Sequence, residues 1–245
     1  MIQEVWLGDC LDLMKNIDDK SIDMVLCDLP YGTTACTWDV IIPFESLWEC
    51  YKRIIKDNGV IALTGSQPFT SMCVMSNIKW FKYEWIWEKE RPTNIFLMKK
   101  QCGKVHENIC IFYKNQPTYN PITEPAVQPK NNKGNKSQMG EMNEIETFGK
   151  TKAKISKEYN PEIRNPRSVL KISRGTRGNM KLHPTQKPIA LCEYLIKTYT
   201  NEGDLVLDNC AGSGTTLLAA KNLNRQFIGI EKEEKYVDII KDRLK

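Results

Sequence analysis

The sequence predicts an α/β fold with a doubly wound, mostly parallel sheet. Short apolar runs alternate with stretches whose apolar residues recur at helical spacing, which is the pattern of this fold class. Near-continuous apolar runs are typical of strands buried in a parallel sheet. Two of the runs lead to an aspartate, Asp28 and Asp208, and a turn follows each one. The 245 residues are enough for one such domain with an insertion.

The first part of the chain, residues 1–113, predicts alternating strands and helices. Apolar residues at helical spacing predict a helix over residues 44–55, and Asp57-Asn58-Gly59 supplies a signal for its C-terminal end. Short apolar runs predict the strands, which we expect at residues 22–27, 60–64, 83–87 and 107–113.

The last part of the chain, residues 182–245, predicts a strand–helix–strand unit between two further helices. We expect helices at residues 189–199, 216–222 and 233–244, and strands at residues 205–207 and 226–230. A glycine-rich loop joins the first of these strands to the middle helix, and Glu231 follows the second strand. Because this is a βαβ pattern, it belongs to the same kind of sheet as residues 1–113.

The middle of the chain, residues 114–181, has a different composition. Apolar periodicity fades, Pro, Asn, Lys and Gly become frequent, and the only strand signal lies near residues 168–172. The segment carries 14 Lys/Arg against 6 Asp/Glu, or +8, which leaves −3 for the rest of a chain of net charge +5. A positive excess gathered in one segment indicates contact with a polyphosphate. We therefore predict an insertion at residues 114–181 between the two halves, residues 1–113 and 182–245, of one domain.

Composition excludes several other classes of protein. Nine cysteines without a CxxC pair, and only two histidines, predict reduced thiols and no metal site. No apolar run approaches the roughly 20 residues needed to cross a bilayer. The first residues have neither the basic lead nor the apolar core of a signal peptide. We expect a cytoplasmic protein without a membrane partner.

The loop that follows the strand at residues 205–207 predicts a cofactor site. Gly212 and Gly214 let the backbone approach a ligand closely before a helix begins. A dinucleotide fits poorly, because Leu217 stands where its fingerprint requires a small residue. S-adenosylmethionine fits better, since Asp208 can accept from its ammonium group and Glu231 can accept from both ribose hydroxyls.

The loop Asp28-Leu29-Pro30-Tyr31 predicts catalysis on a nucleobase amine. Such an amine is a poor nucleophile, because its lone pair is conjugated into the ring. Two acceptors, the Asp28 carboxylate and the Leu29 carbonyl, can hold its hydrogens and favour tetrahedral geometry. Pro30 stiffens the loop, and Tyr31 can stack on the base. The base has to leave the duplex to be reached.

These two loops resemble the motifs of amino-methylating DNA methyltransferases, (D/N/S)-P-P-Y and D-P-F-x-G-S-G-T-T. The catalytic motif comes first here, then the place of the target-recognition region, then the cofactor motif, which is the order of the family's β group. The resemblance covers residues 4–113 and 181–242. It implies a class I methyltransferase-like sheet with a circularly permuted motif order, S-adenosylmethionine as cofactor and double-stranded DNA as substrate.

Three further segments resemble motifs of the same group. Gly8-Asp9-Cys10 resembles its acidic motif near the adenine of the cofactor, and the segment from His183 to Pro188 resembles its H-P-T-x-K-P element. His106-Glu107-Asn108 matches an element that precedes the recognition region. The resulting cofactor set is Asp9, His183, Thr185, Lys187, Asp208, Cys210, Gly212, Gly214, Thr215 and Glu231.

The chain departs from the family pattern at two places. Leu29 replaces the first Pro of the catalytic motif, and this is tolerable because the position acts through its carbonyl group. Asn209-Cys210 replaces the usual Pro-Phe, where the Phe packs near the cofactor or the target amine. The second change predicts weaker cofactor binding.

By resemblance, an acidic first residue such as Asp28 is typical of adenine-N6 enzymes, whereas Ser is commoner in cytosine-N4 enzymes. Cytosine-N4 transfer, an RNA or protein amino-methyltransferase and a non-catalytic DNA-binding module remain alternatives. Ring-carbon methylation is not expected, because no Pro-Cys pair occurs.

The inserted segment also yields expectations about partners. Its candidate DNA contacts are Arg164, Arg167, Arg174 and Arg177. The resemblance points to a homodimer. No endonuclease signature is visible, so any partner restriction endonuclease is a separate chain, and the sequence leaves open a role in restriction–modification, phage defence or regulation.

Overall fold

The computed structural model describes residues 2–34, 36, 39–125, 163–174 and 186–245. The chain forms two compact units, Met1–Asn120 with Arg167–Lys245, and Pro121–Pro166. In chain order, the elements of the described residues are β1 (Gln3–Leu7), α1 (Cys10–Leu13), η1 (Met14–Asn16), β2 (Ile22–Cys27), α2 (Phe44–Ile54), β3 (Ile55–Gly65), α3 (Phe69–Ser76), β4 (Phe81–Glu88), η2 (Ile95–Leu97), β5 (His106–Phe112), β6 (Glu124–Pro125), β7 (Ile163–Arg164), β8 (Val169–Lys171), α4 (Ile189–Tyr199), β9 (Leu205–Asp208), α5 (Thr215–Asn222), β10 (Gln226–Glu231) and α6 (Glu234–Arg243).

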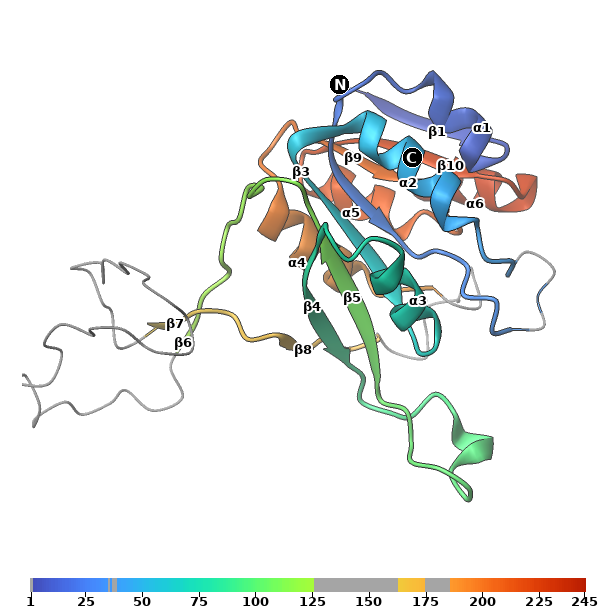
Figure 1. Cartoon of the computed structure of the whole chain (residues 1–245), viewed down its shortest axis with the longest axis vertical. Helices are drawn as coiled ribbons and strands as arrows, with labels where there is room; N and C mark the ends of the chain where they lie inside the picture. The colour runs from blue at the N-terminus through green and yellow to red at the C-terminus, as the bar shows by residue number, and fades with distance from the viewer. Residues whose placement is uncertain (1, 35, 37–38, 126–162, 175–185) are drawn as a thin grey trace, which may run out of the picture. The chain divides into compact units, whose positions relative to one another are not determined.

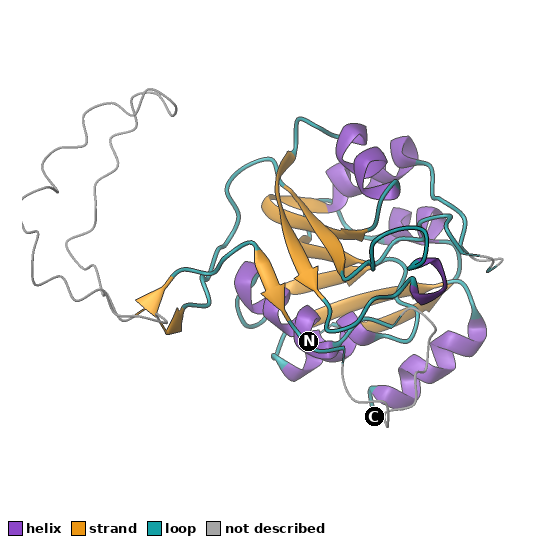
Figure 2. Ribbon diagram, turned by 90° about the horizontal axis from the view of Figure 1, so that it is seen from below, coloured by secondary structure: helices purple, strands orange, loops and turns teal. Residues whose placement is uncertain are grey.

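The first unit is built on a sheet of strand order β1-β10-β9-β2-β3-β5-β4-β8 (Figure 1). All its neighbouring strands are parallel except β5, which is antiparallel to both β3 and β4. Helices cover the sheet on two sides (Figure 2). The predicted α/β fold with a doubly wound, mostly parallel sheet is therefore confirmed, and the two halves of the chain share that sheet.

Alternate residues of each central strand enter cores on opposite faces of the sheet. On β2, Val25 and Cys27 pack in one core with residues of α2 and α3, while Met24 and Leu26 pack in the other with residues of α4 and α5. This alternation follows from the two-residue period of a strand. Burial on both faces explains why the strand sequences are nearly continuous apolar runs.

One predicted boundary is wrong. Asp57-Asn58-Gly59 does not end a helix, because α2 stops at Ile54 and β3 begins at the next residue. Ile55 pairs with Ile22 of β2, and the register then shifts before the regular pairing resumes. At Gly59 an added Cβ would lie 2.8 Å from the Ile55 side chain, so the glycine permits this close approach inside an irregular strand.

The insertion predicted at residues 114–181 contributes to both units. The strand expected near residues 168–172 is present as β8, which pairs with β4 in the main sheet. In the second unit β6 and β7 form an antiparallel pair, in which Arg164 faces Glu124. No helix among the described residues is long and apolar enough to cross a membrane.

Candidate active site

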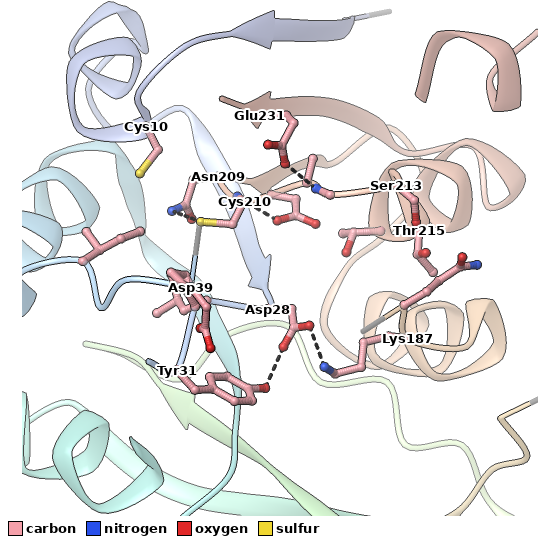
Figure 3. A pocket seen from close by; sticks show the side chains of 18 of the residues that line it. Cys10, Asp28, Tyr31, Asp39, Lys187, Asn209, Cys210, Ser213, Thr215 and Glu231 are labelled. Carbon is pink, nitrogen blue, oxygen red and sulfur yellow. Dashed lines mark hydrogen bonds and ion pairs between the residues drawn. The ribbon is translucent and has the colours of Figure 1, made fainter. Parts of the chain in front are cut away.

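Three carboxylates meet at one edge of the main sheet. Asp28 follows β2, Asp208 ends β9 and Glu231 ends β10. β2 is followed by α2 on one face of the sheet, whereas β9 is followed by α5 on the other, so a crevice opens between these neighbouring strands. A cavity of about 790 Å³ lies at this edge, and its lining includes all three carboxylates. Figure 3 shows Asp28 and Glu231 in this lining.

Asp28 is held by three donors. Its Oδ2 accepts from Lys187 Nζ at 2.5 Å, and its Oδ1 accepts from the hydroxyls of Tyr31, at 2.6 Å, and of Thr64. Burial alone would raise the pKa of Asp28, but the ammonium of Lys187 and the two hydroxyl donors hold it below its usual value. Asp28 is thus an ionised acceptor.

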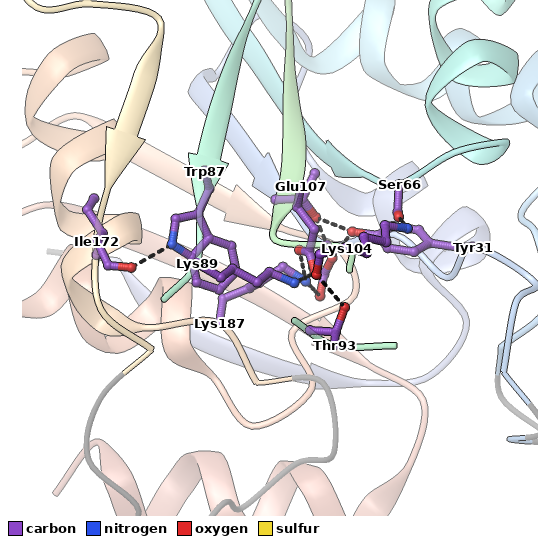
Figure 4. A network of polar contacts seen from close by, with 11 residues as sticks. Tyr31, Ser66, Trp87, Lys89, Thr93, Lys104, Glu107, Ile172 and Lys187 are labelled. Atoms are coloured by element: carbon purple, nitrogen blue, oxygen red, sulfur yellow. Dashed lines mark hydrogen bonds and ion pairs between the residues drawn. The ribbon is translucent and has the colours of Figure 1, made fainter. Parts of the chain in front are cut away.

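Lys187 has a second carboxylate beside it (Figure 4). Its Nζ lies 3.3 Å from Glu107 Oε2, while Glu107 Oε1 accepts from Lys89 Nζ. Burial lowers the pKa of Lys187, but Asp28 and Glu107 together raise it above the ordinary value, so the ammonium stays charged. The two cations and two carboxylates form one connected network.

Tyr31 is fixed at both ends of its side chain. Its hydroxyl donates to Asp28 and lies 2.8 Å from Thr64 Oγ1. Its ring packs against Phe69 with the centroids 4.9 Å apart, and Lys187 Nζ lies 5.7 Å from the ring centroid. The contact predicted between this ring and a target base stays a prediction.

Asp39 shapes the loop that follows Tyr31. Its carboxylate accepts from three consecutive backbone amides, those of Gly32 and Thr33 at 2.9 Å and that of Thr34 at 2.7 Å. Burial would raise the pKa of Asp39, but a hydrogen bond from the Thr34 hydroxyl and those from the three amides lower it. The charged form of Asp39 therefore holds one wall of the cavity in place.

Asp208 is more deeply buried than Asp28, with 3% of its surface exposed, and its surroundings are different. Its Oδ1 accepts from the backbone amide of Cys210 at 3.1 Å, and no ion pair of the described residues includes it. Burial raises its pKa to about 7, despite hydrogen bonds from Thr216 and Cys210 that lower it. A buried carboxylate of this kind suits a ligand that brings a positive charge.

Glu231 is oriented by two backbone amides. Its Oε2 accepts from Gly212 N at 2.7 Å and its Oε1 from Glu233 N at 2.9 Å. Each carboxylate oxygen can accept a second hydrogen bond, so the pair matches the two hydroxyls of a ribose. Gly214 adopts φ 76° as the N-cap of α5, where an added Cβ would lie 2.9 Å from Ile240, and it is not among the cavity-lining residues.

The Asn209-Cys210 pair is tied into the fold. Asn209 is buried, and its Oδ1 accepts from the Tyr51 hydroxyl of α2 at 2.7 Å. Cys210 lines the cavity near Cys10 (Figure 3). A hydrogen bond with Cys10 lowers the pKa of the Cys210 thiol, but a hydrogen bond with Cys27 and burial raise it well above its ordinary value, so the thiol is neutral. The pair thus presents small, uncharged groups where the family pattern has Pro-Phe.

Most of the predicted catalytic and cofactor residues line the one cavity. These are Asp9, Asp28, Leu29, Pro30, Tyr31, Lys187, Asp208, Cys210, Gly212, Thr215 and Glu231. Asp9 also caps α1, accepting from Leu11 N at 2.8 Å. His183 and Thr185 lie outside the described residues.

The structure describes three of the four predicted DNA-binding arginines, two in the first unit and one in the second. Arg174 lines the cavity, and Arg167 is exposed just before β8. Arg164 pairs with Glu124 at 2.6 Å within the second unit. Arg177 lies outside the described residues.

The sequence did not single out Thr64, Asp39 or Lys89. Thr64 carried a usable signal, since it ends the run predicted as a strand at residues 60–64 and a parallel strand beside β2 must end at the same edge. Asp39 and Lys89 carried no usable signal. The partners of Asp39 are backbone amides, and the partner of Lys89 is the Glu107 side chain, 18 residues further along the chain.

The fold and this cavity define a methyltransferase of the kind that modifies DNA. A family model described as DNA methylase, that of the N6 and N4 methyltransferases, matches residues 22–242. The chain therefore belongs to that family, and the prediction of an amino-methylating DNA methyltransferase is confirmed.

Similar curated proteins include two type II methyltransferases. M.HpaI of Haemophilus parainfluenzae is 27% identical, and the match covers 100% of this chain and 74% of that protein. M.HinfI of Haemophilus influenzae is 30% identical, with 97% and 67% covered.

Solved structures agree on the fold. A complex of M1.HpyAVI with SAM superposes with a TM-score of 0.65 at 26% identity, covering 100% of this chain and 99% of that one. The cytosine-N4-specific PvuII DNA methyltransferase has a TM-score of 0.69 at 19% identity, with 98% and 86% covered, and so shares the fold.

Proposed function

We propose that this chain transfers a methyl group from S-adenosylmethionine to the exocyclic N6 of adenine at a specific site in duplex DNA. One observation carries the proposal: Asp28, an ionised acceptor, shares a single cavity with Asp208 and Glu231, which suit a cation and a diol. The similarity to type II methyltransferases supports DNA as the substrate and a place in a restriction–modification system.

The chain's own residues match the parts of S-adenosylmethionine. Asp208 offers a buried carboxylate for the ammonium group, and the Glu231 oxygens offer acceptors for the two ribose hydroxyls. Asp9 and Gly212 line the same cavity. When bound, the cofactor supplies an electrophilic methyl group on a positively charged sulfur.

Asp28 acts on the target amine as an acceptor of its hydrogens. Holding an N–H at an ionised carboxylate increases the electron density on the nitrogen and favours the geometry in which its lone pair can react. Tyr31 and Thr64 both donate to Oδ1 and fix the carboxylate. The Pro30 ring stiffens the backbone between Asp28 and Tyr31.

Lys187 keeps Asp28 ionised before the base arrives, but its ammonium also occupies Oδ2. A second position for that ammonium is at hand. Glu107 Oε2 lies 3.3 Å from Lys187 Nζ and is a buried oxygen to which no described residue donates a hydrogen bond. A shift of Lys187 toward Glu107 therefore frees Asp28 Oδ2 for the amine without leaving the ammonium unpaired.

Adenine is favoured over cytosine because the first residue of the catalytic motif is Asp28. Cytosine-N4 transfer remains the second candidate, since it needs the same acceptors and the PvuII cytosine-N4 methyltransferase shares this fold. Expression in methylation-free bacteria, followed by mass spectrometry of the nucleosides and sequencing of modified bases, tests the choice. N6-methyladenine at one sequence is expected, and N4-methylcytosine would overturn the choice of base.

A second assay tests the class of substrate. Tritium transfer from labelled S-adenosylmethionine is measured with unmethylated DNA, RNA and protein as acceptors. We expect label in duplex DNA. Label in RNA or protein only, or intact cofactor binding with no transfer, contradicts the proposed function.

We also propose, on the resemblance, that the chain acts as a cytoplasmic homodimer and that any partner endonuclease is a separate chain. Sedimentation equilibrium of the purified protein tests the first part, since a monomer at micromolar concentration contradicts it. Sequencing of the neighbouring genes tests the second.

A further inference from the structure

The connection between β4 and β5, residues 89–105, carries an apolar tip, and we call it the β4–β5 finger. It extends beyond the end of the sheet in the first unit (Figure 1). Phe96 at the tip is 100% exposed, Ile95 is 66% exposed, and Leu97 and Met98 are each 48% exposed. Four neighbouring apolar side chains in water are a costly arrangement for an isolated protein, which indicates a contact surface.

The stem of the finger is braced by hydrogen bonds. Thr93 N donates to Lys104 O at 3.0 Å across the stem. The Asn94 side chain makes two further bonds, since its Nδ2 donates to Cys102 O at 3.0 Å and its Oδ1 accepts from Lys104 N at 2.6 Å. The two sides of the stem are therefore held together directly below the tip.

Close packing adds to this bracing. An added Cβ at Gly103 would lie 2.9 Å from Pro92 Cγ, so the stem requires glycine there. The tip itself is a turn of 3₁₀ helix, Ile95–Leu97. Exposure of the apolar side chains thus results from a built structure that presents them.

Charge indicates what the finger contacts. The finger has five cations, Lys89, Arg91, Lys99, Lys100 and Lys104, and one acidic residue, Glu90. Cations flanking an apolar wedge match a nucleic acid, in which phosphates surround stacked bases. They match poorly the interior of a protein interface, which is depleted of Lys.

The finger stands next to the active site. β4 ends and β5 begins at the same edge of the sheet as Asp28, because β5 is antiparallel to β3 and β4. Thr93 and Lys104 of the stem line the same cavity as Asp28. A duplex placed over the cavity would therefore meet the finger.

We propose that the β4–β5 finger binds duplex DNA and that Phe96 inserts between base pairs beside the target nucleotide. The inference rests on the proposed function, in which the target base leaves the stack to enter the cavity. Departure of the base opens a gap in the stack, and an apolar ring stabilises the opened duplex by filling or flanking that gap. Lys99 and Lys100 contact the adjacent phosphates.

The test compares Phe96→Ala with wild type on two duplexes that carry the methylation site. In one the target base is paired, and in the other it faces a mismatched base, so that less energy is needed to extrude it. We expect the variant to lose about tenfold to hundredfold in single-turnover rate on the paired duplex and to recover most of it on the mismatched one. Cofactor binding, measured by calorimetry, is expected to stay unchanged.

Ile78→Ala is the matched control. Ile78 is a 60% exposed apolar residue just before β4, at the opposite edge of the sheet, and its loss should leave both rates within about twofold of wild type. A Phe96→Ala variant that loses equally on both duplexes, or that behaves as the control does, overturns the proposal. A change of oligomeric state with no dependence on base pairing would instead assign the finger to a second copy of the chain.

A binding assay separates this inference from the proposed function. Fluorescence of 2-aminopurine at the target position rises when the base leaves the stack, whether or not methyl transfer follows. Wild type and Ile78→Ala are expected to raise it, and Phe96→Ala to raise it much less. Absence of transfer by wild type with this pattern intact contradicts only the proposed function, whereas equal signals from Phe96→Ala and wild type contradict the finger.

Discussion

Asp28 and Asp208 lie at the ends of two neighbouring parallel strands, β2 and β9. Their pKa values are nevertheless shifted in opposite directions. Lys187 and two hydroxyls surround Asp28, and its pKa lies below the ordinary value. Asp208 has no ion pair among the described residues, and burial raises its pKa to about 7. The Lys187 ammonium and the two hydroxyls thus distinguish Asp28, whose side chain is 26% exposed, from the more deeply buried Asp208.

The difference in pKa between the two aspartates corresponds to two functions, catalysis and ligand binding. A catalytic acceptor must be ionised before the substrate arrives, so its charge has to be compensated by the protein itself. A carboxylate that binds a cationic ligand can remain uncompensated, because the ligand removes the unfavourable burial when it binds. We therefore assign Asp28 to the reaction and Asp208 to cofactor binding.

The largest effect is expected from Asp28→Ala. The amine loses its ionised acceptor, and we expect the single-turnover rate to fall by about 10³-fold or more. Cofactor affinity, measured by equilibrium binding, should stay within about twofold, because Asp208 and Glu231 are untouched. A large loss of cofactor affinity would contradict the division of roles between the two aspartates.

The next largest effect is expected from Lys187→Met. Without the ammonium, burial of Asp28 is no longer opposed by its strongest partner, so the pKa of Asp28 rises. Since the ionised form is the active one, the rate should fall by about 10²-fold at neutral pH and partly recover as the pH increases.

Rate measurements across the pH range check this prediction. Lys187→Arg keeps the charge beside Asp28 and is the matched control, in which the acid limb of the profile should stay close to that of wild type. A Lys187→Met variant whose rate falls equally at every pH would show that Lys187 does not act through the ionisation of Asp28.

Protonation of Asp208 should produce a smaller effect, which appears in the affinity for S-adenosylmethionine. Ionisation of this carboxyl is needed to hold the ammonium of the cofactor, and its pKa in the free protein is about 7. The dissociation constant of S-adenosylmethionine should therefore increase as the pH falls, by about tenfold for each pH unit below 6. Asp208→Asn should bind more weakly at pH 8 and lose this pH dependence.

The same raised pKa predicts an opposite trend in stability. Relative to an ordinary carboxyl of pKa 3.8, Asp208 contributes stability in acid that is lost as the pH rises through about 7. The unfolding free energy of the cofactor-free protein should hence fall across this window, and the fall should be smaller in Asp208→Asn. Denaturant unfolding at pH 5 and pH 8 measures it, and identical trends in the two proteins would contradict the shift.

The sequence predicted the strands best where they are buried on both faces. β2, β5, β9 and β10 were found because their apolar runs are nearly continuous. The edge strand β1, Gln3–Leu7, was missed because it is mostly exposed and has no such run. The start of β3 was misplaced because Asp57-Asn58-Gly59 has the local chemistry of a helix end, and only the pairing of Ile55 and Val60 with β2 on either side makes this segment part of a strand.

For the candidate site, too, the sequence predicted local features but not contacts between distant residues. Residues that belong to one local motif, such as Asp28 with Tyr31, could be predicted from spacing along the chain. The pairing of Lys187 with Asp28 joins positions 159 residues apart, and no local pattern encodes it. Lys187 was predicted from the sequence as a cofactor-binding residue, and only the fold reveals its contact with Asp28.

The smallest effect is expected from the hydroxyls that donate to Asp28. Thr64→Val keeps the shape of the side chain on β3 but removes one donor to Oδ1, while Tyr31 keeps the other. A single hydrogen bond of this kind contributes about 1 kcal/mol, so the single-turnover rate should fall about fivefold. Tyr31→Phe removes the second donor and should cost a similar factor.

The double variant shows whether both hydroxyls act on Asp28. They accept and donate within one small cluster, since Tyr31 Oη also lies 2.8 Å from Thr64 Oγ1. Groups that share a partner are expected to be non-additive, so the loss in the double variant should differ from the product of the single losses. Simple multiplication of the two factors would mean that the hydroxyls act on Asp28 independently of each other.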